Sequence, residues 1–139
     1  MVTLKQFFMG RDLIYRASLT DELKANAQVT VDRVNALLSA AKQAGVTLQD
    51  HPDNHSLVSS GWRPPRVNAL TAGAAPKSKH MTCQALDVYD PDGDLDDWCM
   101  DHLDQLEAIG LWLEHPSATK GWCHLQTLPP RSGKRVFYP

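Results

Sequence analysis

Three residues of types that bind divalent metals stand in two short motifs of the chain. His80 and Asp87 lie in SKHMTCQALD with six residues between them, and His124 lies in GWCHLQ, 37 positions further on. Two imidazoles and one carboxylate form a ligand set for Zn²⁺, and a catalytic zinc site uses three protein ligands and leaves a fourth position for water. These residues are therefore candidate zinc ligands, although an isolated His–Asp pair is often only a surface hydrogen bond.

Two strands have to bring these side chains together. The alternation over residues 84–89 predicts a strand in which Asp87 points away from the apolar side, onto an open face. Residues 122–127 predict a second strand, with His124 on its polar face. If the two polar faces are aligned, Asp87 and His124 converge, and His80 approaches from the loop that precedes the first strand.

The remaining elements follow from apolar spacing, capping residues and turn residues. Thr20 is a good N-cap, and apolar residues at intervals of three or four predict a long helix that ends at Gly45. A second helix is expected from about Asp94 to Gly110. Shorter elements are expected at residues 3–9 and after Pro64 and Pro65 (helical), and at residues 57–62, 111–113 and 136–138 (strands).

Helices and short strands do not alternate regularly in this pattern. We therefore expect an α+β fold, a small antiparallel sheet with helices packed on one side, built as a single domain over residues 1–139.

The composition limits the classes of partner. A formal net charge of −2 gives no basic field for nucleic acid, and no stretch approaches the roughly 20 apolar residues that a membrane span requires. The N-terminal segment lacks the apolar core of a signal peptide, and the three widely spaced cysteines are an odd number that cannot pair fully into a disulfide scaffold. We expect a monomer that is cytoplasmic as made, with no nucleic-acid partner and no membrane insertion.

Three motifs, SGWRPPRVN, SKHMTCQALD and WCHLQ, resemble the zinc peptidases of the D-alanyl-D-alanine carboxypeptidase and L-alanyl-D-glutamate endopeptidase family. That family shares a fold with the Hedgehog signalling domain. Its pattern is Ser-Gly-aromatic-Arg, then Ser-x-His with Asp seven residues after the His, then Trp-x-His or His-x-His. The positions that match here are Ser60, Gly61, Trp62, Arg63, Ser78, His80, Ala85, Asp87, Trp122 and His124.

The resemblance spans roughly residues 55–130 and extends to small phage-encoded murein peptidases. It implies a Hedgehog/DD-peptidase-like fold and a Zn²⁺ cofactor held by His80, Asp87 and His124. It also implies a peptidoglycan stem peptide as substrate. An endolysin-like protein of a phage or prophage would act on the cell wall after release, or as part of the virion.

Two positions depart from the family pattern. Cys83 stands where the family usually has glycine, and Gly121 stands where many members carry an acidic residue, three positions before the last zinc-binding histidine. The motif therefore leaves the general base unassigned. Glu114 is our candidate and His115 the alternative; a solvated carboxylate at a strand end is the competing interpretation of Glu114.

Three further side chains are candidates for substrate binding. Arg63 matches a family arginine that contacts substrate, and its guanidinium offers bidentate geometry to a carboxylate, unless it only ties down the following loop. Ser78 is expected to contact substrate or to orient His80. Gln126 shares a strand face with His124 and either lines the cleft or is an ordinary edge-strand residue.

The function that these features predict is a zinc-dependent peptidase that hydrolyses peptide bonds in bacterial peptidoglycan. Carboxypeptidase and endopeptidase activities occur on the same framework, so the bond that is cut stays open. The alternative is a non-catalytic, zinc-containing phage structural or cell-wall-binding module, which the missing acid at Gly121 would permit.

Overall fold

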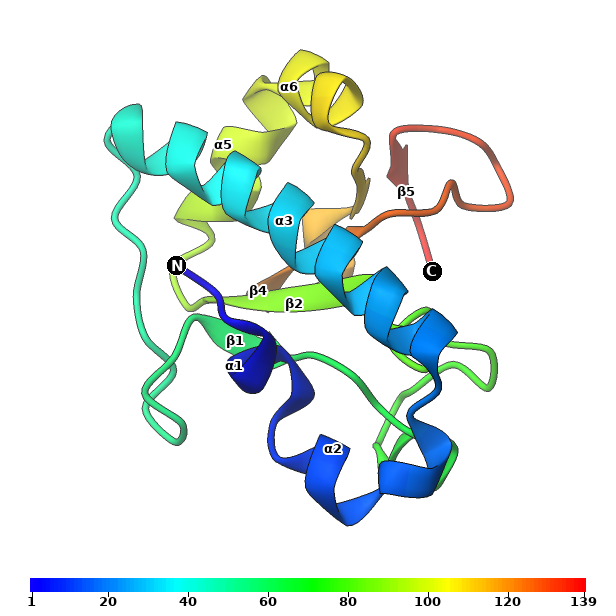
Figure 1. The fold of residues 1–139 in the computed structure, drawn as a ribbon. Coiled ribbons are helices and arrows are strands. Elements are labelled where there is room, and N and C mark those ends of the chain that lie inside the picture. Colours follow the sequence, from blue (N-terminus) through cyan, green and yellow to red (C-terminus); the bar gives the residue numbers. More distant parts are fainter.

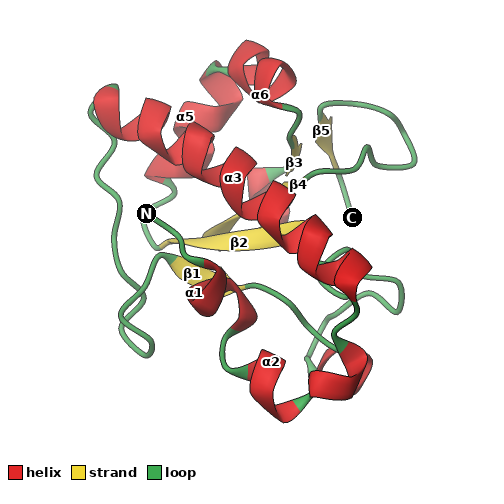
Figure 2. Ribbon diagram, viewed as in Figure 1, coloured by secondary structure: helices red, strands yellow, loops and turns green.

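The computed structural model describes all 139 residues and contains a five-stranded sheet with strand order β1-β2-β4-β3-β5. Figures 1 and 2 show the sheet behind a long diagonal helix. Three neighbouring pairs of strands are antiparallel, and β5 runs parallel to β3. The predicted α+β class is therefore confirmed, with one parallel edge strand that we did not expect. The strands are β1 (Val58–Ser60), β2 (Ala85–Asp90), β3 (Trp112–Glu114), β4 (Gly121–Gln126) and β5 (Val136–Phe137).

The predicted long helix is α3 (Asp21–Gln43), which lies across β2 in Figure 1. The Thr20 side chain accepts a hydrogen bond from the backbone N–H of Leu23, as an N-cap does. The helix buries one apolar stripe in the same core as the inward-facing residues of β2, β3 and β4. The polar side chains of these strands are therefore left on the opposite face of the sheet.

The single helix expected between Asp94 and Gly110 is wrong, because the chain forms α5 (Asp94–Asp101) and α6 (Leu103–Ile109) with a break at His102. The ring Nδ1 of His102 lies 2.7 Å from the carbonyl oxygen of Trp98, the group to which its own backbone N–H would donate in a continuous helix. The ring also stacks on Trp98. This side chain competes with the helical hydrogen bond and turns the chain.

The N-terminal segment packs against the strand that leads into the first motif. The backbone N–H of Trp62 donates to the carbonyl oxygen of Phe7, so the end of α1 is joined to the residues that follow β1. None of the helices has the length and apolar character needed to cross a bilayer. The remaining helical elements are α1 (Leu4–Phe8), α2 (Arg11–Ile14), α4 (Pro65–Leu70) and the short 3₁₀ turns η1 (Arg16–Ser18) and η2 (Pro116–Ala118).

Candidate metal centre

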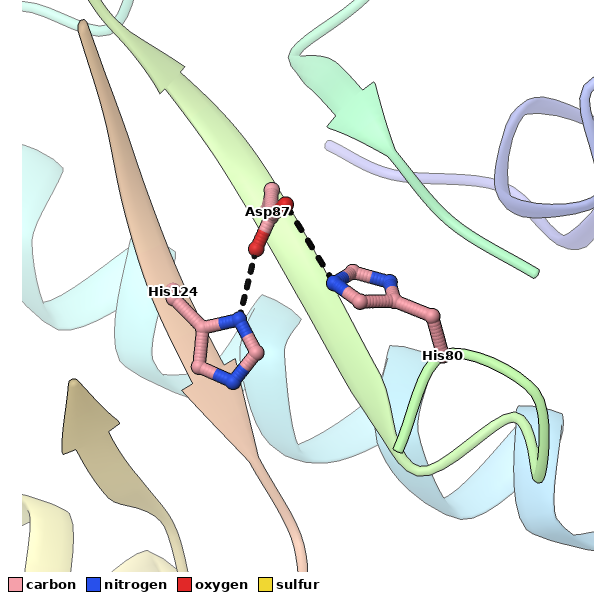
Figure 3. A group of neighbouring side chains, drawn as sticks. All are labelled: His80, Asp87 and His124. Carbon is pink, nitrogen blue, oxygen red and sulfur yellow. Dashed lines mark hydrogen bonds and ion pairs between the residues drawn. The ribbon is translucent and has the colours of Figure 1, made fainter. Parts of the chain in front are cut away.

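The register of β2 and β4 places Asp87 directly opposite His124. His124 Nδ1 lies 2.7 Å from Asp87 Oδ1, and His80 Nε2 lies 3.2 Å from Asp87 Oδ2 (Figure 3). One donor atom from each of the three residues lies within 4.8 Å of the others. The expected convergence of three distant residues is therefore present in the fold. Asp87 does not lie on an open face of the sheet as expected, because it is only 9% exposed.

His80 is held by the backbone of the Ser-Gly-aromatic-Arg motif. Its Nδ1 lies 2.8 Å from the carbonyl oxygen of Gly61, and its own carbonyl accepts a hydrogen bond from the Arg63 N–H. The buried indole of Trp62 donates from Nε1 to the carbonyl oxygen of Met81. Since a carbonyl can only accept, Nδ1 of His80 carries the ring proton, and the lone pair of Nε2 points toward Asp87.

Gly61 is required at its position by packing. A Cβ atom there would lie 1.9 Å from the carbonyl oxygen of Phe7, which is a backbone atom already bonded to Trp62. Only glycine lets the two backbones approach this closely. The motif thus positions the carbonyl group that orients His80, a role that the sequence pattern alone did not reveal.

His124 is bonded through both ring nitrogens. Nδ1 faces Asp87, and Nε2 lies 3.0 Å from the amide oxygen of Gln126. Burial alone would lower the pKa of His124, but its hydrogen bond to Asp87 and the charge of that carboxylate outweigh burial and raise the pKa to about 9. In return, the hydrogen bond and the positive charge of His124 help to hold the pKa of Asp87 below its usual range despite its burial.

The donor set fits a zinc ion. Burial lowers the pKa of His80, so this imidazole is neutral near pH 7 and can act as a ligand. Its Nε2 is buried and has no hydrogen-bond partner, because its contact with Asp87 lacks hydrogen-bond geometry. A buried nitrogen lone pair without a partner is costly, and a cation between these groups would remove that cost. Two nitrogens and one carboxylate oxygen also form a borderline set that suits zinc.

The three residues line a pocket of about 430 Å³, together with Glu114, Arg63, Ser78 and Gln126. Its walls come from the loop before β2 and from the C-terminal tail, and residues 72–75 and 137–139 contribute to them. His115 is not among the lining residues, because its Nδ1 pairs with Ser117 and its ring stacks on Tyr138. Of the two candidate bases, the pocket therefore contains Glu114.

Glu114 ends β3, and its place follows from the strand register. Leu113 pairs with Leu125, the neighbour of His124, and Glu114 and His124 line the same pocket. The half-buried carboxyl group has a raised pKa, because burial outweighs the attraction of His124, and Asp87 adds to the increase. A pocket carboxylate is thus supplied from β3, although Gly121 offers none.

Arg63 and Ser78 form a pair at the pocket. The Ser78 hydroxyl oxygen accepts hydrogen bonds from Arg63 Nη2 and from the backbone N–H of His80, both at 3.2 Å. Arg63 is half-buried, and burial lowers its pKa while Asp87 acts in the other direction. No ion pair within 4.0 Å neutralises this guanidinium, so it remains able to bind an anionic group of a ligand.

Cys83 lies beside the centre without belonging to it. Its φ of 59° is in the left-handed region that favours glycine, the residue that the family pattern described above has at this position. The side chain is fully buried in the apolar core, and burial raises the pKa of the thiol to about 12. The thiol is therefore protonated at neutral pH and acts as a small apolar group.

Comparison with known proteins places the chain in a family. Searches of curated proteins and of solved structures found no match. The sequence profile of the family described as Peptidase M15 matches residues 16–108, about two thirds of the chain. The matched region includes His80 and Asp87 and ends before Glu114 and His124, which the sheet register adds to the same pocket. By this match, the chain belongs to the peptidase M15 family.

Proposed function

We propose that the protein is a zinc-dependent peptidase that hydrolyses peptide bonds in bacterial peptidoglycan, with His80, Asp87 and His124 as its zinc ligands. One observation carries the proposal. An N, O, N donor set with a buried, unpartnered nitrogen lies in the same pocket as a carboxylate and an unpaired guanidinium. Membership of a peptidase family is consistent with this chemistry.

The residues divide the work of amide hydrolysis between them. When bound, zinc polarises the scissile carbonyl and lowers the pKa of the attacking water. Glu114 acts as general base, taking a proton from that water and returning it to the leaving amine. A base is most effective when its pKa is near the working pH, and burial moves the pKa of Glu114 in that direction.

The substrate is a short peptide that carries a carboxylate near the scissile bond. Arg63 binds that carboxylate in bidentate fashion, and Ser78 holds the guanidinium in place. Stem peptides of peptidoglycan provide such groups both at the free carboxyl end and within the chain, so a carboxypeptidase and an endopeptidase would each use this contact.

The site and its supporting elements form one zinc peptidase domain over residues 1–139, which we propose to be monomeric. On the resemblance of its three motifs to small phage-encoded murein peptidases, we propose an endolysin-like role for a phage or prophage product. Its target would be the cell wall, reached after release from the cell or as part of a virion.

Digestion of purified peptidoglycan with zinc-loaded protein tests this function. Mass spectrometry should reveal new amino and carboxyl termini in the stem peptides, and these termini identify the bond that is cut. His80→Ala should lose both metal and activity. If folded, zinc-loaded protein releases no termini from several peptidoglycan types, the non-catalytic zinc module is the better interpretation.

A further inference from the structure

We infer that Gln126 is a positioning residue that fixes which ring nitrogen of His124 faces the metal. The inference rests on the proposed zinc site, and it gives Gln126 a role beyond lining the pocket. Gln126 is 4% exposed and stands two residues after His124 on the same face of β4.

The orientation of the Gln126 amide is determined by its second partner. Its Nε2 donates to the carbonyl oxygen of Leu128 at 2.8 Å. A carbonyl only accepts, so the amide NH₂ group has to lie on that side, and the amide oxygen has to face His124. Gln126 therefore presents an acceptor, and not a donor, to the imidazole.

That acceptor selects one tautomer of His124. The amide oxygen lies 3.0 Å from Nε2, so Nε2 donates a proton to it, and in the metal-free protein Nδ1 donates another to Asp87. Figure 3 shows Nδ1 directed toward Asp87, and the proton on Nδ1 is the one that a metal ion would displace. In a zinc-loaded protein, His124 then binds through Nδ1 and His80 through Nε2, because the Gly61 carbonyl holds the opposite tautomer there. Two different acceptors thus set two different tautomers around one carboxylate.

The expected size of the effect follows from comparable sites. Partners that hold the second nitrogen of a metal-binding histidine typically change metal affinity by about 10–100-fold. Gln126→Leu removes the acceptor at similar volume, and zinc affinity should fall by about that factor. Gln126→Glu keeps an oxygen acceptor toward Nε2 but loses the N–H that donates to the Leu128 carbonyl, so its zinc affinity should fall by less than that of Gln126→Leu.

The experiment measures zinc affinity by competition with a chelating dye, together with ¹⁵N NMR of the His124 ring at one fixed pH. Thr127→Val is the matched control, since Thr127 is buried on the same chain segment and its hydroxyl contacts Gln84, not His124. The zinc-loaded natural protein should show a proton on Nε2 of His124 and a metal-perturbed Nδ1. Gln126→Leu should weaken this signature, and Gln126→Glu and Thr127→Val should keep it.

Three results would overturn the inference. The first is a proton on Nδ1 of His124 in the zinc-loaded protein, and the second is equal zinc affinity for Gln126→Leu and Thr127→Val. The third is an equal loss in Gln126→Glu and Gln126→Leu with both proteins folded, which would mean that the acceptor oxygen is irrelevant. These results leave the proposed function standing, whereas a natural protein that binds no zinc overturns both.

Discussion

At the scale of single residues, the proposed zinc site depends on which polar atoms face each other in the pocket. Asp87 presents one oxygen to each histidine, and a backbone carbonyl and a side-chain amide hold the outer ring nitrogens. The three candidate ligands are thereby oriented before any ion binds, which reduces the reorganisation that binding requires.

Glu114→Gln tests the general base. The substitution keeps the size of the side chain and removes its ability to accept a proton, so kcat should fall by about 10²–10⁴-fold with zinc content unchanged. The measurement is turnover of a defined stem peptide by metal-loaded protein. A loss of only a few-fold would assign the role to another group, and His115→Gln is the control, expected to leave turnover nearly unchanged because His115 does not line the pocket.

The proton on His124 makes zinc binding depend on pH. A metal ligand has to be deprotonated, and the pKa of His124 in the metal-free protein is raised to about 9, mainly by Asp87 against the opposing effect of burial. Below that pH zinc displaces a proton, so its apparent affinity should weaken about tenfold for each unit of decreasing pH.

Calorimetry in buffers of different ionisation enthalpy measures this exchange. Near pH 7 His124 should release about one proton for each zinc ion, in addition to any proton from the zinc-bound water, and His80 contributes none because its pKa is lowered by burial. Affinity that is constant between about pH 6.5 and 8, with no proton release, would contradict the arrangement of the three groups.

At the scale of elements, three backbone segments that pack on one another set the position of His80. The residues after β1 approach the end of α1 on one side and the loop before β2 on the other, through Trp62 and Arg63. Displacing this segment would move the Gly61 carbonyl and release the ring of His80.

Gly61→Ala tests that packing. The added methyl group would meet the Phe7 carbonyl at 1.9 Å, so we expect a loss of roughly 3 kcal/mol or more in the free energy of unfolding, together with weaker zinc binding. Gly45→Ala is the control, because its methyl group meets nothing within 4 Å. The left-handed backbone alone should lower its free energy of unfolding by about 1–2 kcal/mol. Equal denaturation midpoints for the two variants would show that the close approach has no energetic consequence.

Substitutions at position 83 can separate the energetic cost of the left-handed backbone from the effect of losing the thiol. Cys83→Ala and Cys83→Gly both remove the sulfur, but only glycine is unstrained at a φ of 59°. The glycine variant should therefore be more stable than the alanine variant by about 1 kcal/mol, the reverse of their usual order. Urea denaturation of both variants decides the sign, and a more stable alanine variant would show that strain is absent there.

At the scale of the whole molecule, the sequence predicted what depends on local pattern. Alternation identified β2 and β4 and the faces that carry Asp87 and His124, and capping and apolar spacing identified α3. The break at His102 was missed because it depends on a side chain that binds the carbonyl of Trp98, which apolar spacing does not record. Apolar periodicity and capping residues therefore predict helices and strands well, but they do not predict individual side-chain hydrogen bonds.

The order of the strands in the sheet could not be predicted from the sequence either. The order β1-β2-β4-β3-β5 brings Glu114 into the same pocket as His124, and this order depends on tertiary packing between strands that are not consecutive. The parallel pairing of β5 with β3 has the same origin. The sequence therefore indicated Glu114 as a candidate base from its position in the chain. Its location near the histidines could be seen only in the folded sheet.

The central claim is that His80, Asp87 and His124 bind one zinc ion with no fourth protein ligand. Anomalous scattering at the zinc absorption edge from crystals of zinc-loaded protein tests it most directly. We expect a single strong peak about 2.0–2.2 Å from His80 Nε2, His124 Nδ1 and an Asp87 oxygen. A zinc-loaded crystal with its peak elsewhere, or with a fourth side chain on the ion, would contradict it.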